Sequence, residues 1–331
     1  MTRLKPLPLI HQQRGVALMI VILIFALVSL LSVGMHNRQK TFIQSASSVS
    51  AMSQAYEYAM GSEIYARRLL KDDWDNDKSA NEFVDGLDQV SNAIVLPVDQ
   101  AALEAQFNDM HGRLNINDLV DVGGSPNALM RERFEALFSR LALDTLTVDL
   151  LQDWIDDNQD VSGIDGAEDG EYLNMAPAYR SASQPFMHSS ELLALLNVDQ
   201  KEIASLRPHV SMLPRGWGMT NVNTASAEVL QSIVKDLPDA DAERLVEQLQ
   251  DTPWKSLQEF ANDPVFKGKT IDQTNLSVYS NFFEVATRIT LNERKVRLRS
   301  VILRNQSDGS MQVIQRDQGQ KYLITKEKLG L

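Results

Sequence analysis

The 331-residue sequence predicts an α+β fold in which a long N-terminal helix packs on a small antiparallel sheet and a large α-helical domain is inserted between the strands. Three observations predict it. Helical spacing of apolar residues runs from Val16 to about Leu70. Strand-like segments occur near residues 93–108 and again after residue 282. Helical periodicity fills most of the chain between them, so a helical insert that splits one α+β domain is the economical explanation.

The N-terminal helix begins with an apolar stretch. Val16 to Val33 contains 18 residues without a charge, which is long enough to cross a bilayer. Apolar residues then recur every three or four positions, at Phe42, Ala46, Val49, Met52, Tyr56 and Ala59. No proline occurs from Val16 to Leu96, and the acidic run at residues 72–77 is expected to end the helix.

The apolar stretch predicts a retained membrane anchor, with an ordinary cleaved signal peptide as the alternative. Ser32-Val33-Gly34 would serve as a small-residue cleavage site. The apolar region of a usual signal peptide has about 7–15 residues, so this one is long. Arg3, Lys5 and Arg14 precede the span, and Arg38 and Lys40 follow it, which slightly favours a cytoplasmic N-terminus.

The remaining elements follow from periodicity. Helical spacing returns from Asn127 to about Asp156, and residues 157–188 read as a long acidic loop. Further helices are expected at about 189–197, 199–207, 225–236 and 239–250. Strands are expected at 93–98, 102–108, Phe283–Leu291, Val296–Leu303 and Met311–Ile314, with turns at Asn292-Glu293 and Ser307–Gly309.

Composition restricts the function. The formal net charge is −12, and without the three basic residues of 1–15 the chain has 29 basic and 44 acidic residues, or −15. Such a surface repels nucleic acid and favours basic partners or divalent cations. The absence of cysteine excludes disulfides and thiolate chemistry. The five histidines are scattered, and the chain has no G-x-S-x-G, H-E-x-x-H or phosphate-loop motif.

The acidic loop is a candidate cation site. No lysine or arginine lies between Arg140 and Arg180, and seven carboxylates fall within 16 residues: Asp156, Asp157, Asp160, Asp165, Glu168, Asp169 and Glu171. Calcium takes about six to eight oxygen ligands from flexible loops. The loop is not a standard EF-hand, because Val161 and Ala167 occupy the sixth and twelfth positions counted from Asp156. A solvated acidic loop without a bound ion is the alternative.

The leader junction resembles that of prepilins and pseudopilins. Arg14-Gly15-Val16 joins a basic leader to an apolar helix, and in these families a prepilin peptidase cuts after the glycine and methylates the new N-terminus. The resemblance implies a cut between Gly15 and Val16. These families usually place glutamate fifth after the cut, where this chain has Ile20. An apolar residue there is typical of the K-type pseudopilin.

Longer motifs support the K type. Gly112–Leu119 (GRLNINDL), Asp153–Asp156 (DWID), Gly166–Asp169 (GAED) and Asn221–Ala225 (NVNTA) resemble segments of the type II secretion system minor pseudopilin K family, in the same order. Together with the leader and the late strands, the resemblance spans nearly the whole chain. The chain departs from the family's pattern at Gly170-Glu171-Tyr172 and at Pro177-Ala178-Tyr179, which lie in or beside the acidic loop.

The resemblance implies a domain organisation. It comprises a cytoplasmic leader at 1–15, a transmembrane half-helix at 16–38, the first part of a pilin-like domain at 39–111, an inserted helical domain at 112–275 with its acidic loop at 156–175, and C-terminal strands and tail at 276–331.

The resemblance also implies a function. The chain would be a non-enzymatic, single-pass protein of the bacterial inner membrane with a periplasmic C-terminal domain. It would sit at the tip of the pseudopilus with minor pseudopilins of types I and J and assist the export of folded proteins. Calcium is implied in the acidic loop, and the first-choice ligands are Asp156, Asp160, Glu168, Asp169 and Glu171.

Two other functions are weighed. Asn221–Ala225 resembles the opening of DNA-binding helix-hairpin-helix modules, but Leu237–Asp241 has acids where the glycine hairpin should be, so nucleic acid is not expected as a partner. The other alternative is a membrane-anchored, calcium-dependent periplasmic hydrolase. Because the sequence has no hydrolase motif, its nucleophile, base and acid would have to come from separate segments that meet only in the folded chain.

Overall fold

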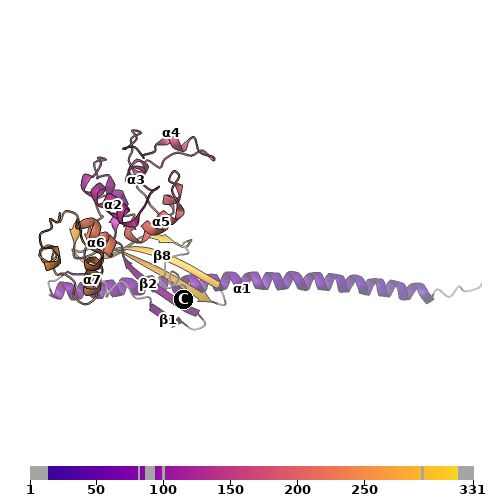
Figure 1. Cartoon of the computed structure of the whole chain (residues 1–331). Coiled ribbons are helices and arrows are strands. Elements are labelled where there is room, and N and C mark those ends of the chain that lie inside the picture. The colour runs from indigo at the N-terminus through magenta and orange to yellow at the C-terminus, as the bar shows by residue number, and fades with distance from the viewer. Residues whose placement is uncertain (1–13, 81–82, 86–93, 99–100, 292–293, 320–331) are drawn as a thin grey trace, which may run out of the picture. The chain divides into compact units, whose positions relative to one another are not determined.

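The computed structural model describes residues 14–80, 83–85, 94–98, 101–291 and 294–319. The chain divides into two units, Met1–Ala55 and Tyr56–Leu331. Helix α1 (Arg14–Ala80) starts in the first unit and ends in the second. In the first unit it contains a stretch long and apolar enough to cross a membrane, with a mean hydropathy of 3.1 and no part of it buried (Figure 1). The predicted apolar helix is therefore confirmed as a helix.

The second unit is built on a five-stranded antiparallel sheet with the order β1-β2-β7-β8-β9. Its strands are β1 (Ile94–Val98), β2 (Ala101–Asp109), β7 (Phe282–Leu291), β8 (Arg294–Arg304) and β9 (Met311–Asp317). In the β7–β8 pair, Ile289 lies opposite Val296 and Phe283 lies opposite Ile302, so the predicted hairpin is confirmed. Its turn at residues 292–293 lies outside the described residues.

The second half of α1 packs on this sheet. Ala66 and Leu70 form a small apolar core with side chains of β2, β7 and β8, namely Phe107, Phe283, Val285 and Ile302. Two polar contacts fix the helix on the strands. The Ser62 and Thr287 hydroxyls lie 2.6 Å apart, and the Glu63 carboxylate accepts hydrogen bonds from Arg316 at 2.8 and 2.9 Å.

The prediction that residues 72–77 end the helix is wrong. Helix α1 continues to Ala80 because its last turns have tertiary partners. Trp74 is 2% exposed and its Nε1 donates a hydrogen bond to the Gln306 carbonyl oxygen at 3.1 Å. Lys71 and Lys78 lie over the Trp74 ring, 4.0 and 4.7 Å from its centroid. Burial of this tryptophan outweighs the low helix propensity of the neighbouring aspartates.

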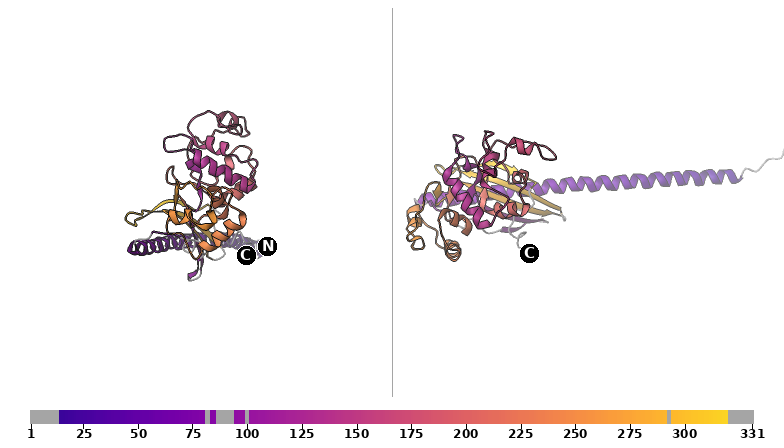
Figure 2. Two further views of the ribbon diagram at one scale, coloured as in Figure 1. Left: turned by 60° about the vertical axis from the view of Figure 1, so that its left-hand side comes forward. Right: turned by 45° about the horizontal axis from the view of Figure 1, so that its top comes forward.

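The helical domain is inserted between two neighbouring strands. Strands β2 and β7 pair along their length, from Ala101 opposite Leu291 to Asp109 opposite Phe283, although the helical region separates them in sequence. This confirms the predicted fold class, whereas the exact domain boundaries stay a prediction. The helices of the insert gather beside the end of the sheet where β2 ends and β7 begins (Figure 1 and Figure 2).

The insert has one continuous apolar core that draws on residues from Leu114 to Val278. Its α-helices are α2 (Ala128–Leu141), α3 (Val148–Ile155), α4 (Asp169–Tyr172), α5 (Gln200–Leu206), α6 (Ala227–Ile233), α7 (Asp239–Leu249) and α8 (Leu257–Ala261). Its 3-10 helices are η2 (Ile116–Leu119), η3 (Glu191–Ala194), η4 (Arg207–His209) and η5 (Pro264–Phe266). Two short parallel pairs were not predicted: β3 (Leu114–Asn115) with β4 (Val210–Ser211), and β5 (Thr220–Asn221) with β6 (Leu276–Ser277).

The helical stretch predicted from Asn127 to Asp156 is two helices. Asn127 caps the start of α2, because its side chain accepts a hydrogen bond from the backbone N–H of Met130. Ala142 ends α2 in the left-handed conformation, with φ of 50°. Helix α3 then starts after Thr147, whose side chain accepts from the N–H of Leu150. The expected loop at 157–188 contains the short helix α4.

Candidate cation site in the acidic loop

The C-terminal end of α3 and the start of α4 bring acidic side chains together. Asp153 and Asp156 belong to the last turn of α3 and its C-cap, and Glu168 immediately precedes α4. Aromatic packing joins the two helices. The rings of Trp154 and Tyr172 meet edge to face with centroids 5.4 Å apart. Because both rings are buried, the carboxylates that flank them are held at a fixed place in the fold.

The three carboxylates form a compact, buried cluster. Asp153, Asp156 and Glu168 each offer an oxygen, and these oxygens lie within 4.8 Å of one another. The three residues are 0, 3 and 2% exposed. Asp153 accepts a hydrogen bond from the backbone N–H of Ser162 at 3.0 Å. Asp156 Oδ1 and Glu168 Oε1 are buried and have no hydrogen-bond partner among the residues that the structure describes.

Burial and mutual repulsion raise the proton affinity of the cluster. Burial, then the neighbouring Asp153, raises the pKa of Asp156 to about 6. The same two causes raise the pKa of Glu168 to about 8, with Asp156 contributing as well. Burial also raises the pKa of Asp153. Three carboxylates at this distance need protons or a cation to remain together near neutral pH.

Two glycines allow the loop to pass close to acidic side chains. A Cβ at Gly166 would lie 2.2 Å from Asp153 Oδ2, and a Cβ at Gly163 would lie 2.0 Å from Asp149 Oδ2. Gly163 also has a φ of +61°, which residues with a side chain rarely adopt. The positive φ favours glycine at 163, and a side chain at 166 would also meet the Ser162 backbone.

The structure brings together only part of the predicted ligand set. Asp156 and Glu168 lie in the cluster. Asp160 is exposed. Asp169 forms an ion pair with Arg180 at 2.8 Å and accepts a hydrogen bond from the N–H of Ser181. Glu171 accepts a hydrogen bond from the N–H of Glu168 at 2.9 Å.

Asp153 is the residue that the ligand prediction missed. It lies in the DWID motif, three residues before Asp156, so the two can share one side of a helix end. Asp169 and Glu171 instead hydrogen-bond to the loop backbone and hold its shape. The cluster of Asp153, Asp156 and Glu168 is an all-oxygen set with two unsatisfied oxygens, which fits a hard divalent cation such as calcium.

The leader residues begin α1. Gly15 and Val16 lie in its first turn, and Ile20, the fifth residue from Val16, is 50% exposed.

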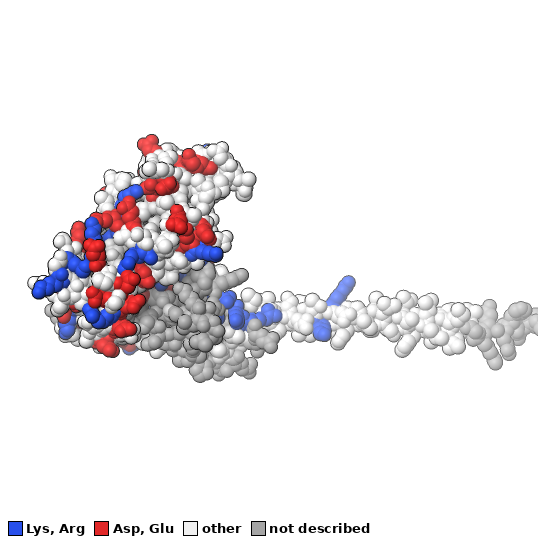
Figure 3. Space-filling model, in the orientation of Figure 1, with Lys and Arg blue, Asp and Glu red and all other residues white. Residues whose placement is uncertain are grey.

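Figure 3 shows acidic and basic side chains interspersed over the face of the second unit, with mainly acidic ones at the upper end of the insert, where Figure 1 labels α4.

Comparison with known proteins identifies the family. Models of type II secretion system (T2SS) protein K match residues 112–215 and 220–279. The chain is 32% identical over 317 residues to the type II secretion system protein K of Pseudomonas aeruginosa, covering 93% of each chain. It is 26% identical over 331 residues to that of Aeromonas hydrophila, covering 95% of this chain and 99% of the relative.

A solved structure shares the fold. The match is to a chain of the crystal structure of the GspK-GspI-GspJ complex from the enterotoxigenic Escherichia coli type 2 secretion system. The TM-score is 0.68 at 24% identity, covering 81% of this chain and 97% of that one. The two chains therefore share an α+β fold. The family models and the relative that is 32% identical show that the chain belongs to the type II secretion system protein K family.

Proposed function

We propose that this protein is a non-enzymatic minor pseudopilin at the tip of the type II secretion pseudopilus, where it initiates assembly and assists the export of folded proteins across the outer membrane. The observation that carries the proposal is the combination of an apolar N-terminal helix with a helix-and-sheet domain split by a large insert, in a member of the protein K family.

The bulk of the insert supports a terminal position. The insert occupies the chain between Asp109 at the end of β2 and Phe282 at the start of β7. A filament that repeats one small domain has little room for such an insert, whereas the end of a filament has room. The apolar Ile20 agrees with this position. A carboxylate there would cost about 2.5–3.5 kcal/mol in lipid unless a preceding subunit supplied a partner, and a first subunit has none.

The partners we propose are minor pseudopilins of types I and J. A chain with this fold occurs in a structure titled as the GspK-GspI-GspJ complex. Membrane insertion in the bacterial inner membrane, with the C-terminal domain in the periplasm, follows from the basic leader and the apolar helix. Prepilin peptidase would cut between Gly15 and Val16 and methylate Val16.

The acidic loop would bind calcium in this function. Asp153, Asp156 and Glu168 would be its carboxylate ligands, and a bound ion would neutralise them and fix the loop on the end of α3. Asp160, which is exposed in the same loop, would add negative charge rather than a ligand oxygen. Asp169 and Glu171 support the loop backbone. The role that we propose for the ion is structural, because the three carboxylates come from the end of α3 and the start of α4.

DNA binding is not proposed. Asp239 and Asp241 occupy the first turn of α7, where a helix-hairpin-helix module presents backbone amides to phosphate. Asp239 also forms an ion pair with Arg140, which brings a carboxylate to the place a phosphate would need.

Co-expression tests the proposal. The tagged full chain, extracted in detergent, should co-purify with pseudopilins of types I and J from the same secretion system, and its deletion should abolish secretion. Ile20→Glu should keep the complex but reduce secretion, whereas Ile24→Val, an apolar change in the same helix, should have no effect. A full chain that binds neither pseudopilin, or whose deletion leaves secretion intact, would contradict the proposal.

Intact-mass analysis of the membrane-extracted protein tests the processing. The mature chain should start at Val16. A mature terminus near Met35 would show cleavage by ordinary signal peptidase and would remove the anchor from the proposal.

A further inference from the structure

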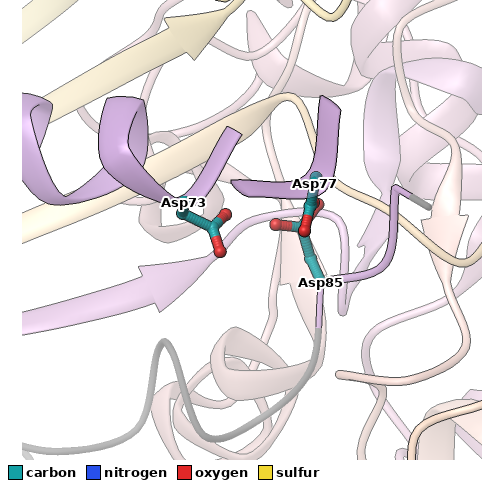
Figure 4. Close-up of side chains that lie close together, drawn as sticks. All are labelled: Asp73, Asp77 and Asp85. Atoms are coloured by element: carbon teal, nitrogen blue, oxygen red, sulfur yellow. The ribbon is translucent and has the colours of Figure 1, made fainter. Parts of the chain in front are cut away.

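Three other carboxylates meet at the C-terminal end of α1. Asp73 and Asp77 lie one turn apart on the helix, and Asp85 lies on the segment that follows it. Each offers an oxygen, and the three oxygens lie within 4.8 Å of one another. Figure 4 shows the helix and the later segment extending these side chains toward one another. The acidic run at 72–77 thus contributes two members to a partly buried cluster.

Asp85 is fixed in this position by the segment that leads into β7. It is 1% exposed, and its backbone N–H donates to the Val278 carbonyl oxygen at 3.0 Å. Its Oδ2 accepts a hydrogen bond from the N–H of Ser280 at 2.7 Å. Its Oδ1 is buried and has no hydrogen-bond partner among the residues that the structure describes. A buried carboxylate oxygen without a partner indicates a positively charged ligand at this point.

Arg304 pairs with two members of the cluster. Arg304 is fully buried, and its guanidinium forms ion pairs with Asp73 at 2.9 Å and with Asp85. The same guanidinium thus serves two of the three carboxylates. The carboxylate oxygens lie close enough to repel one another, so the cluster gains from a further positive charge.

The C-terminal end of α1 also favours a bound cation. The last carbonyl groups of an α-helix lack intrahelical donors, and the helix dipole places partial negative charge there. Asp77 lies in the last turn of α1, which ends at Ala80. Carboxylates and carbonyls are hard oxygen donors, the type that calcium binds with about six to eight ligands.

We propose that Asp73, Asp77 and Asp85 bind a second hard divalent cation, most suitably calcium, at a site separate from the acidic loop. The cation offsets the repulsion between the carboxylates, satisfies Asp85 Oδ1 and joins the end of α1 to the segment that leads into β7. The effect is to anchor the helix end to the point where the chain returns from the insert to the sheet.

Counting bound ions tests this site. The full chain in detergent is stripped with a chelator, equilibrated with calcium and examined by native mass spectrometry. The unmodified chain should bind two calcium ions and Asp77→Asn one. Asp77 is the ligand to change because Arg304 pairs with the other two acids, Asp73 and Asp85, and thermal melting verifies that the variant is folded. Asp75→Asn is the matched control, since Asp75 has the same charge on the same turn but forms an exposed ion pair with Lys71.

Further variants separate the two sites. Glu168→Gln should keep one ion, and the double variant Asp77→Asn, Glu168→Gln should bind none. Asp77→Glu should partly restore binding. Equal ion counts for the unmodified chain and Asp77→Asn would overturn the proposal, as would a single ion that Glu168→Gln abolishes. A single ion lost in Asp77→Asn but kept in Glu168→Gln would support this site and refute the loop site.

Discussion

Glu168 should make the stability of the calcium-free protein fall as the pH rises. Its pKa is raised from the usual 4.5 to about 8 in the folded chain by burial and by Asp153 and Asp156. Between these values the folded state keeps a proton that the unfolded state has lost. Because a raised carboxyl pKa contributes stability below the unfolded pKa, that contribution is lost as the pH rises through the folded pKa.

The magnitude follows from one proton. A single group that binds one more proton in the folded state changes the free energy of unfolding by up to about 1.4 kcal/mol per pH unit. From about pH 6 to about pH 8, Glu168 therefore lowers the free energy of unfolding by up to about 3 kcal/mol. Asp156, with a pKa raised to about 6, titrates mainly below this range. Asp73, with a pKa of about 7, contributes in the same range.

The matched variant Glu168→Gln isolates the effect of Glu168. The assay is urea unfolding of the full chain in detergent with a chelator present, followed by tryptophan fluorescence. The free energy of unfolding should fall steeply from pH 6 to pH 8 in the unmodified chain and less steeply in Glu168→Gln. The contribution of Asp73 is common to both and cancels in the comparison. Saturating calcium should flatten the slope, and a hundredfold excess over Kd should add about 2.7 kcal/mol. Identical slopes for the two chelated proteins would refute the reasoning.

Three further changes test the surrounding structure. Asp153→Asn should weaken calcium binding in calorimetry by about 10–100-fold through loss of a charge-assisted contact, whereas the exposed Asp160→Asn should change it less than about twofold; equal effects would exclude Asp153 as a ligand. Asn117→Ala removes two hydrogen bonds donated to Phe186 and Leu213 carbonyls and one accepted from the Phe186 N–H, so urea unfolding should show a loss of about 2–4 kcal/mol. Arg304→Met leaves buried acids without their guanidinium and should cost about 3–5 kcal/mol; an unchanged urea midpoint would show that these acids are protonated in the native chain.

Local patterns were sufficient to predict the sheet. The alternation of Phe283–Leu291 predicts strand β7 because one face of that strand is buried against α1 and the other carries polar groups in contact with neighbouring strands. The end of α1 was mispredicted because a run of aspartates discourages helix locally, while burial of Trp74 against the β8–β9 turn acts through tertiary contacts. Sequence periodicity contains no information about that distant partner.

The ligand set was only partly predictable for the same reason. Charge density correctly indicates the acidic loop as the place where carboxylates gather, and Asp156 and Glu168 meet there. Which acids turn inward depends on Trp154 and Tyr172, whose packing directs Asp153 into the cluster. Asp85 has no local signal at all, because its neighbours Ser280 and Arg304 lie almost 200 residues or more away in sequence.

The junction between insert and sheet also depends on buried polar contacts. Asp109, at the end of β2, accepts hydrogen bonds from the hydroxyls of Ser280 at 2.5 Å and of Thr224. Asn221 donates to Ser280 Oγ at 2.8 Å and to the Asp85 carbonyl oxygen at 3.1 Å. Apolar packing is non-directional and would tolerate small rotations of the insert, whereas a satisfied buried network accepts one arrangement. Because Asp85 belongs to both this network and the acidic cluster of α1, we expect a cation bound there to stiffen the junction and to couple the insert to the end of the long helix.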